Sequence, residues 1–433
     1  MSFNATVLGS PVETYTLASI LQISLAALVI SILILSIFLS SRWSKSRLPN
    51  LQRSGETLLP KISIILPTWN EEKVIAAKLD DVESQEYPDD LLEVIIIDSA
   101  SSDATINIVE KWISDRGFES GGKYRIIQED SRRGKSYSIN RAFDEADRES
   151  EILMMSDVDC RLAEGVVLMI ANRFSDESIG AVTGRQILLN LDQNRKSAEE
   201  GSYRDFFSRM RIAESRFSST PIFHGECAAY RRDAISGHKL VENSNADDSQ
   251  MAVSAIRSGF RSIYDPDITF YEMAPPDGRA SKIQKVRRAQ GLVRHFWRNR
   301  DMIYDQRFGN FRKVMALEFT LHIVLPLAMV IGFIAGFFHI GLLINDFGFQ
   351  LNPVYSISLL DKLMLICDLF VMLLLTSGFF GIPIPGSRLS ITFFNFMVTL
   401  FKAQILILTG HSLHQWQQVS AVRDILAEFD KNS

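Results

Sequence analysis

The chain has little of what a secreted scaffold or a nucleic-acid-binding protein needs. Its 433 residues include only three cysteines, Cys160, Cys227 and Cys367, which lie far apart. That spacing excludes a disulfide framework and a cysteine-rich metal knuckle, and it favours a reducing compartment. The formal net charge of −5 gives no reason to expect a nucleic-acid partner. Polyphosphates and lipids are the expected ligands.

The first hydrophobic run lacks the basic stretch that precedes the apolar core of a cleaved signal peptide. No charged residue occurs between Thr14 and Ser41, and the run is long enough to cross a membrane. The positive charges of Arg42, Lys45 and Arg47 all come after it. This pattern predicts a retained transmembrane anchor at residues 14–41, with its C-terminal flank in the cytoplasm.

Three more apolar runs occur near the end of the chain, at residues 319–344, 363–383 and 391–409. They predict a C-terminal transmembrane bundle of three segments within residues 315–410, followed by a tail at residues 411–433. Residues 60–280 have the right length for one cytoplasmic domain. Residues 281–312 combine an apolar helical stripe with basic side chains, which is typical of a helix in the lipid headgroup layer. We therefore expect an integral protein of the cell membrane.

Short apolar runs rich in β-branched residues alternate with helical patterns in the soluble part. Strands are expected at residues 61–67, 91–98, 124–127, 151–155 and 180–184. Helices are expected at residues 71–85 and 135–146. This alternation predicts an α/β fold, a doubly wound sheet with helices on both faces. The polar segment at residues 192–202 is expected to be a mobile loop, because it offers little apolar surface to bury.

Two acids, Asp157 and Asp159, closely follow the strand that ends at Met155. In an open α/β sheet, ligands bind at the carboxyl ends of the strands. Two carboxylates at this spacing can hold one divalent cation, Mg²⁺ or Mn²⁺, together with the phosphates of a substrate. The alternative is a turn with two solvated acids.

Other charged residues stand at the ends of the expected elements. Asp98 ends a strand, where a carboxylate can accept hydrogen bonds from a nucleobase or a sugar. Lys135 is the first residue of a predicted helix, and the free N–H groups at the start of that helix could bind a polyphosphate. Alternatively, Lys135 belongs to a basic segment that is simply exposed to solvent. Asp247 and Asp248 precede another helix. They either cap that helix or, if one of them faces the diphosphate, accept the proton of an attacking hydroxyl.

Seven segments follow one another between residues 61 and 300: Ile64 to Glu72, Asp98 with Asp103, Gly134-Lys135, Asp157-Val158-Asp159, Gly225 to Arg232, Asp247-Asp248 and Gln284 to Gly291. In this order they resemble the successive motifs of family 2 glycosyltransferases. The similarity is to the membrane-embedded, polysaccharide-synthase-like branch, which includes the cellulose, hyaluronan and poly-N-acetylglucosamine synthases.

The resemblance implies a GT-A-like domain that binds a nucleotide-sugar donor and is flanked by transmembrane helices. It implies that Pro67, Thr68 and Asp98 hold the nucleotide, beside Lys135, and that Asp157 and Asp159 bind the metal, the diphosphate and the sugar. Asp248 matches the general base of the family. The acceptor and the diphosphate would be flanked by Asp247, Gln284, Arg287 and Arg288.

Three positions depart from the pattern of the family. Ser99 stands where a second acid usually follows Asp98, and Asp247 stands where a glutamate usually precedes the base. Arg288 replaces the tryptophan of the last motif, which removes an aromatic platform for an acceptor sugar. The loss of this platform argues against processive synthesis.

The expected reaction is an inverting, metal-dependent transfer of a sugar to a membrane-associated acceptor. A glycan is favoured as acceptor by the three C-terminal segments, whereas Arg288 favours the alternative, single-sugar transfer to a polyprenyl phosphate. A further alternative, motivated by Ser99 and Arg288, is a non-catalytic membrane regulator that binds nucleotide sugars.

Overall fold

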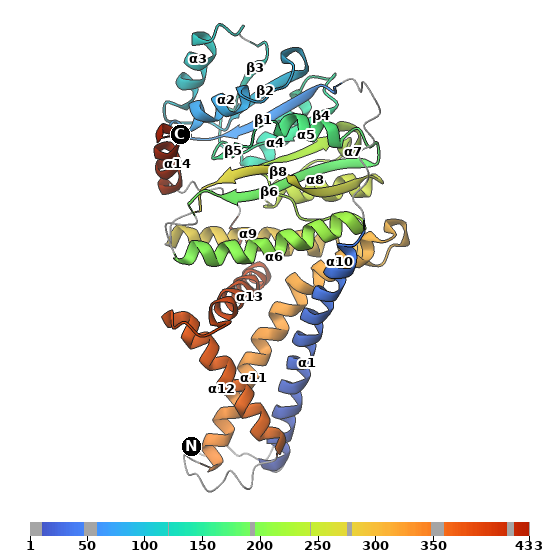
Figure 1. Ribbon diagram of the computed structural model, residues 1–433, viewed down its shortest axis with the longest axis vertical. Coiled ribbons are helices and arrows are strands. Elements are labelled where there is room, and N and C mark those ends of the chain that lie inside the picture. Colours follow the sequence, from blue (N-terminus) through green and yellow to red (C-terminus); the bar gives the residue numbers. More distant parts are fainter. Residues whose placement is uncertain are drawn as a thin grey trace. The chain divides into compact units, whose positions relative to one another are not determined.

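The computed structural model describes residues 11–46, 59–119, 121–190, 195–242, 244–274, 279–347, 359–413 and 420–432. The chain divides into two compact units (Figure 1). The helical unit contains residues 1–39 and 317–409, and the sheet unit contains residues 40–316 and 410–433. All of the predicted site residues belong to the sheet unit.

The sheet unit is built on one mixed sheet with the strand order β3-β2-β1-β4-β7-β6-β8-β5. The strands are β1 (Ile62–Thr68), β2 (Leu92–Asp98), β3 (Tyr124–Gln128), β4 (Ile152–Met155), β5 (Cys160–Leu162), β6 (Ile179–Leu188), β7 (Ala228–Arg231) and β8 (Arg261–Glu272). The first four are parallel to one another, and β7 is antiparallel to both of its neighbours. The five strands expected from the sequence correspond to β1 to β4 and β6.

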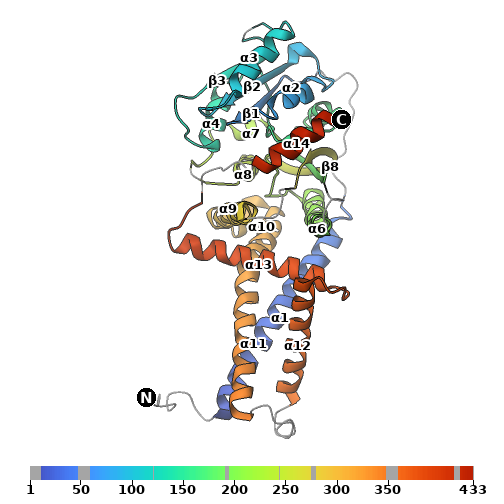
Figure 2. The same cartoon turned by 90° about the vertical axis from the view of Figure 1, so that its left-hand side faces the viewer.

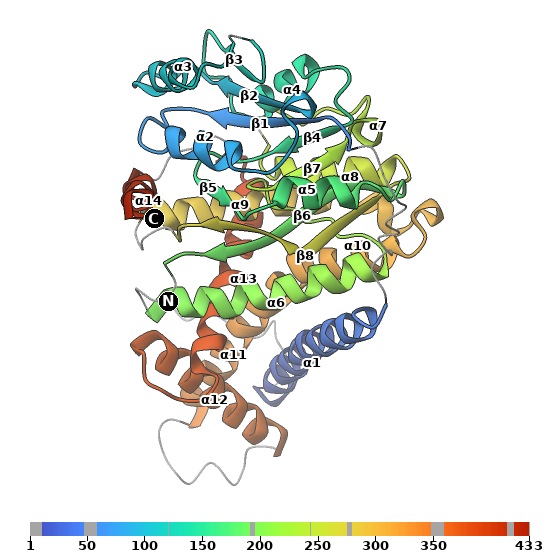
Figure 3. The same ribbon diagram turned by 45° about the horizontal axis from the view of Figure 1, so that its top comes forward.

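Helices cover both faces of this sheet, because successive residues of a strand point to opposite sides. One face is covered by α2 (Ile75–Glu83), α3 (Thr105–Asp115) and α5 (Val166–Arg173), and the other by α4 (Lys135–Glu145), α7 (Arg232–Ile235) and α8 (Asp247–Arg257). Ile64 of β1 packs in the first core, whereas its neighbour Ile65 packs in the second. The predicted doubly wound α/β fold is confirmed (Figure 3).

Two longer helices, α6 (Arg195–Phe217) and α9 (Arg279–Arg298), belong to the same unit. The prediction of a mobile loop was wrong for residues 195–202, which form the first turns of α6; residues 192–194 lie outside the described residues. Lysine, alanine and glutamate are good helix formers, so a polar segment can be helical without burying much apolar surface. In α9, Val293 and Phe296 of the apolar stripe are buried in the protein. A position in the headgroup layer stays a prediction.

Four helices are long and apolar enough to cross a membrane in the part of the chain that the structure describes. They span Ser19–Trp43 within α1 (Pro11–Trp43), Phe311–Leu342 across α10 (Phe311–Phe319) and α11 (Leu325–Phe347), Leu359–Phe380 (α12) and Ser387–Leu408 (α13). Within the helical unit, α1 runs beside α11 and α12 (Figure 2). Gln22 of α1 donates a hydrogen bond to Asp368 of α12. Membrane insertion and its orientation stay predictions.

Candidate active site

The loops that follow the parallel strands lie at one edge of the sheet. β1 carries Pro67 and Thr68 at its end, and Thr68 pairs with Asp98, the last residue of β2. Asp98 in turn pairs with Gln128 at the end of β3. On the other side of β1, β4 ends at Met155. Because α/β sheets bind ligands at the carboxyl ends of their strands, this edge is the candidate site.

Three non-glycine residues in the loops of this edge have a left-handed backbone. Their φ angles are 54° at Asn70, 56° at Ala100 and 65° at Ala246, and they are the only such residues in the described part of the chain. A left-handed conformation costs a non-glycine residue about 1–2 kcal/mol. Strained backbone of this kind gathers at ligand sites, where the surrounding structure holds it in place.

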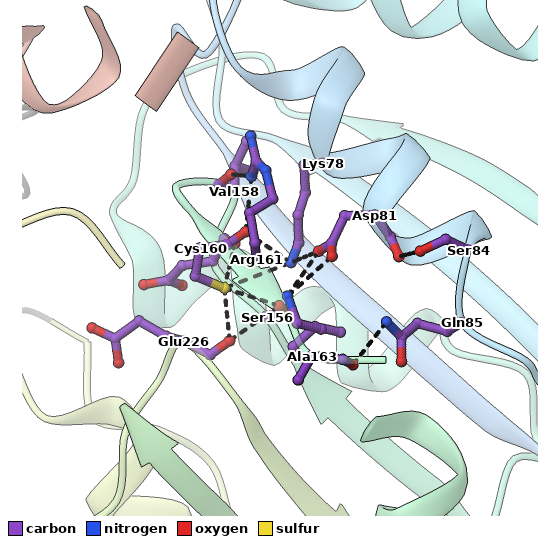
Figure 4. A network of polar contacts seen from close by, with 12 residues as sticks. Lys78, Asp81, Ser84, Gln85, Ser156, Val158, Cys160, Arg161, Ala163 and Glu226 are labelled. Atoms are coloured by element: carbon purple, nitrogen blue, oxygen red, sulfur yellow. Dashed lines mark hydrogen bonds and ion pairs between the residues drawn. The ribbon is translucent and has the colours of Figure 1, made fainter. Parts of the chain in front are cut away.

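Buried hydrogen bonds fix the loop that carries Asp157 and Asp159 (Figure 4). Cys160 Sγ lies 3.1 Å from the carbonyl oxygen of Asp157 and 3.1 Å from that of Glu226. Ser156 Oγ donates to the same Glu226 carbonyl at 3.0 Å. These bonds hold two sequence motifs together, the two-acid loop and the segment that precedes β7.

A buried lysine supports the same loop. Lys78 Nζ lies 2.8 Å from Asp81 Oδ2 and donates to the carbonyl oxygen of Cys160 at 3.1 Å. Asp81 also accepts a hydrogen bond from the backbone N–H of Leu162 at 3.0 Å. Burial opposes the charge of Lys78, but the charge of Asp81, together with Cys160 and the hydrogen bond to Asp81, outweighs this effect and raises the pKa of Lys78. The ion pair is therefore a fixed support beneath the two acids.

Lys135 links Asp157 to the neighbourhood of Gly225 and Asp248. Lys135 Nζ is 2.6 Å from Asp157 Oδ1. A Cβ atom at Gly225 would lie 3.6 Å from Lys135 Nζ and 3.9 Å from Asp248 Cγ. The structure therefore brings together Lys135, Asp157 and Asp248, three of the residues that the sequence predicted for the site, close to Gly225.

Asp248, the second residue of α8, is partly buried. Burial, together with the negative charges of Glu226 and Asp247, raises the pKa of Asp248 to about 7. Burial also raises the pKa of Glu226. Tyr230 Oη donates to the backbone carbonyl of Asp248 at 3.0 Å, which fixes the start of the helix. A carboxyl group with such a pKa can both take and release a proton at neutral pH.

Asp247 points toward α4, where it accepts a hydrogen bond from Ser136 Oγ. Burial raises the pKa of Asp247, although the nearby positive charge of Lys135 opposes this effect. Asp247 thus links the starts of α4 and α8, the two helices that carry Lys135 and Asp248.

Helix α9 brings basic side chains to the same cluster. Arg288 Nη2 lies 3.6 Å from Glu226 Oε1 and 3.7 Å from Glu272 Oε1, and its side chain is 49% exposed. Burial and the charge of Arg288 lower the pKa of Arg287 to about 10, so Arg287 remains cationic at neutral pH. Gln284 lies one turn earlier on the same helix face. The sequence did not single out Glu226 and Glu272 as partners of these residues.

Arg423 also belongs to the site, and the sequence interpretation missed it. It lies on the C-terminal helix α14 (Ser420–Asn432). Arg423 Nη1 is 3.0 Å from Asp159 Oδ2, and Arg423 Nη2 is 2.8 Å from Glu71 Oε1. Burial works against the charged form of Asp159, but the charges of Arg423, Lys135 and Arg288 together outweigh it and lower the pKa of Asp159. The spacing of Val422 and Leu426 indicates an amphipathic helix, but nothing in the sequence connects it to Asp159.

The polar side chains predicted to bind the nucleotide, and Ser99 beside them, make hydrogen bonds within the protein. Thr68 Oγ1 donates to the carbonyl of Leu66 at 2.9 Å, and Asp98 accepts a hydrogen bond from the backbone N–H of Ser101 at 3.0 Å. Ser99 Oγ donates to Glu129 Oε2 at 2.9 Å. Burial raises the pKa of Glu129. Glu129, which directly follows β3, therefore lies beside Ser99, the position at which the family usually has a second acid.

The two acids of the loop fit a divalent cation that takes part of its ligands from elsewhere. No group of three or more His, Cys, Asp or Glu side chains suited to a metal occurs among the described residues. Asp157 and Asp159 offer hard oxygen ligands, and each faces a cation, Lys135 and Arg423 respectively. Mg²⁺ in particular binds through one or two carboxylates plus water and substrate phosphates.

The sheet unit is an α/β domain with a cluster of acids at the carboxyl ends of its parallel strands, and it is joined to apolar helices. Glycosyl transferase family 2 matches residues 63–238, and glycosyl transferase family group 2 matches residues 152–400. The second match spans more than half of the chain. The chain therefore belongs to the family 2 glycosyltransferases, as the order of its motifs predicted.

Similar proteins are of several kinds. An N-acetylglucosaminyltransferase of Azorhizobium caulinodans is 25% identical over 56% of this chain and 62% of its own length. A beta-monoglucosyldiacylglycerol synthase of Trichormus variabilis is 26% identical over 64% of this chain and 59% of its own length. The chain thus spans about three fifths of these relatives.

Among solved structures, the mannosyltransferase PcManGT of Pyrobaculum calidifontis, in complex with GDP-Man and Mn²⁺, is similar with a TM-score of 0.69. It is 27% identical, and the match covers 90% of this chain and 99% of that protein. This likeness confirms the GT-A-like fold that the resemblance implied.

Proposed function

We propose that this protein transfers a sugar from a nucleotide-sugar donor to a membrane-associated acceptor, with inversion at the anomeric carbon. The observation that carries this proposal is the convergence of Lys135, Asp157 and Asp248 around Gly225. This arrangement supports a single site that provides positive charge for a diphosphate and a base for an acceptor.

In the proposed reaction, Asp248 takes the proton of an acceptor hydroxyl. The acceptor oxygen forms a bond to the anomeric carbon, and the bond from that carbon to the diphosphate oxygen breaks. Its electron pair leaves with the nucleoside diphosphate, so a single displacement inverts the configuration. In this proposal, Lys135 and Arg287 supply positive charge that stabilises the negative charge building up on the leaving group.

A divalent cation fits this site, and Asp157 and Asp159 would hold it. When bound, Mg²⁺ or Mn²⁺ supplies positive charge that offsets the charge of the diphosphate. The Mn²⁺ in the similar mannosyltransferase structure supports this assignment. Asp98 and the Pro67-Thr68 loop are proposed for the nucleotide, because they lie at the neighbouring strand ends.

Asp248→Asn tests the base. This change keeps the size of the side chain but removes its basicity, so turnover should fall by about 10² to 10⁴-fold while donor binding persists. The measurement is transfer from a panel of radiolabelled nucleotide sugars by the purified protein. Asp267→Asn is the matched control, because the Asp267 side chain is 78% exposed. Near-normal transfer by a folded Asp248→Asn protein would refute the assignment.

Single-sugar transfer to a lipid acceptor is the second candidate. It is favoured by the half-exposed Arg288 guanidinium, which stands where an aromatic platform for a sugar chain is expected. One relative, the glucosyldiacylglycerol synthase, is named for a lipid product. Product analysis separates the two candidates, because an organic-extractable product with one sugar supports the lipid and a long polymer supports the glycan. Failure to transfer or hydrolyse any nucleotide sugar would favour a non-catalytic regulator.

A further inference from the structure

The C-terminal helix α14 is anchored to the sheet unit along its length (Figures 1 and 2). Its apolar residues Val422 and Leu426 are buried in the core that also contains α2 and α5. Polar contacts add to this packing at two points. Lys73 Nζ lies 2.5 Å from Asp424 Oδ1, and Arg161 Nη2 lies 2.7 Å from Asp430 Oδ2. The backbone of α14 is therefore a fixed part of the sheet unit.

The Arg423 side chain reaches from this helix to two acids at once. Its Nε and Nη2 atoms donate to the two carboxylate oxygens of Glu71, at 3.1 Å and 2.8 Å. Its third nitrogen, Nη1, faces Asp159 at 3.0 Å. Two parallel charged hydrogen bonds hold the pair with Glu71, whereas a single nitrogen of Arg423 contacts Asp159. Arg423 can therefore lose its contact with Asp159 and remain bound.

We propose that Arg423 is a built-in competitor of the divalent cation: its guanidinium occupies Asp159 in the resting protein and moves onto Glu71 alone when a metal ion binds. This inference rests on the proposed metal site at Asp157 and Asp159. A metal ion needs the same oxygen lone pairs that Arg423 uses, and two cations on one carboxylate repel each other. The C-terminal helix thereby sets the metal concentration at which the site fills.

Mn²⁺ binding tests this competition without any turnover. The full chain in detergent is titrated with Mn²⁺ in the absence of donor, and free Mn²⁺ is measured by its electron paramagnetic resonance signal. Arg423→Met removes the competing charge and should tighten Mn²⁺ binding roughly tenfold, since tenfold corresponds to only about 1.4 kcal/mol. Glu71→Gln removes the attachment onto which Arg423 withdraws, so Mn²⁺ binding should weaken several-fold.

The opposite signs of these two changes distinguish competition from a structural role. If Arg423 only held the loop in shape, both substitutions would weaken Mn²⁺ binding, and that result would overturn the inference. Lys431→Met is the matched control: it removes a positive charge from an exposed position of the same helix and should leave the titration unchanged. Thermal unfolding of each variant shows whether the sheet unit remains folded.

A third substitution separates this inference from the proposed function. Asp159→Asn should abolish Mn²⁺ binding if the proposed metal site is correct, whatever residue stands at position 423. If Asp159→Asn abolishes binding while Arg423→Met leaves it unchanged, only the competition is wrong. If neither the wild-type protein nor Arg423→Met binds Mn²⁺, even when a nucleoside diphosphate is added to supply phosphate ligands, the proposed metal site itself is wrong.

Discussion

Lys78 donates a hydrogen bond of 3.1 Å to the carbonyl oxygen of Cys160, and through it a buried ion pair supports the loop of Asp157 and Asp159. The ammonium group is fully buried, and its charge is balanced by Asp81. Neither Lys78 nor Asp81 belongs to a sequence motif of the family quoted above. The geometry of the proposed metal site nevertheless depends on this pair, because the loop has no regular secondary structure between β4 and β5.

Lys78→Met should therefore impair both stability and Mn²⁺ binding. The substitution leaves the Asp81 carboxylate buried without its partner, which costs about 3–5 kcal/mol in comparable buried pairs. Thermal unfolding of the detergent-solubilised protein and Mn²⁺ titration measure the two effects. Lys239→Met is the control, because the Lys239–Asp144 pair is exposed on both sides and should contribute little. An unchanged melting temperature for Lys78→Met would contradict the structural role of the pair.

Turnover should rise with pH through about 7, because the pKa of Asp248 is raised to about 7 and only its ionised form accepts a proton. A pH profile of kcat between pH 5 and 9 measures this, and Asp248→Glu should move the midpoint rather than abolish it. The raised pKa of Asp248 also makes the stability of the folded state depend on pH, but stability falls where turnover rises. The unfolded pKa of an aspartate is about 3.9, so the folded state loses stability as pH rises from there to about 7. A flat kcat profile across pH 7 would count against Asp248 as the base.

The strands of the sheet were predictable where burial on both faces leaves a continuous apolar run. β1 and β2 are of this kind, since nearly every residue of both is buried. β5 has only the residues Cys160–Leu162, too few to show a period. β8 contains the sequence Asp265-Pro266-Asp267, and its pairing with β6 shifts register there, so no regular pattern marks it.

The site was predictable only where its residues stand in ordered motifs. Asp157 and Asp248 were found by their positions at the ends of elements and by the order of the motifs. Glu226 and Arg423 were not assigned roles, because contacts made across the fold bring them to the candidate site. Arg423 reaches Asp159 only because α14 packs beside α2, and no local pattern in the sequence predicts that packing.

Ser99→Asp, which restores the usual acid of the family, should be harmful in this protein. Ser99 Oγ donates to Glu129, and Asp at this position would place two carboxylates side by side in a buried environment. We expect a loss of about 1–3 kcal/mol in the free energy of unfolding and weaker donor binding. Adding Glu129→Ser to Ser99→Asp should recover much of the lost stability and donor binding. Thermal unfolding measures the change in stability, and a donor titration followed by protein fluorescence measures donor binding. A Ser99→Asp protein that is more stable than the wild type would contradict this prediction.

Gly291→Ala should slow turnover by displacing the loop that precedes Asp248. A Cβ atom at position 291 would lie 2.7 Å from Cβ of Asn245 and 3.1 Å from its carbonyl carbon. Asn245 holds α9 through a hydrogen bond of 3.1 Å from its Nδ2 to the carbonyl of Arg287, so α9 and the loop must separate. Overpacking of this kind costs about 1–3 kcal/mol. Gly341→Ala is the control, because a Cβ atom there meets no atom within 4 Å. We expect kcat to fall for Gly291→Ala. Mn²⁺ binding should stay near the wild-type value, because it depends on the separate loop of Asp157 and Asp159. An equal loss of kcat and of Mn²⁺ binding would instead indicate general unfolding of the sheet unit.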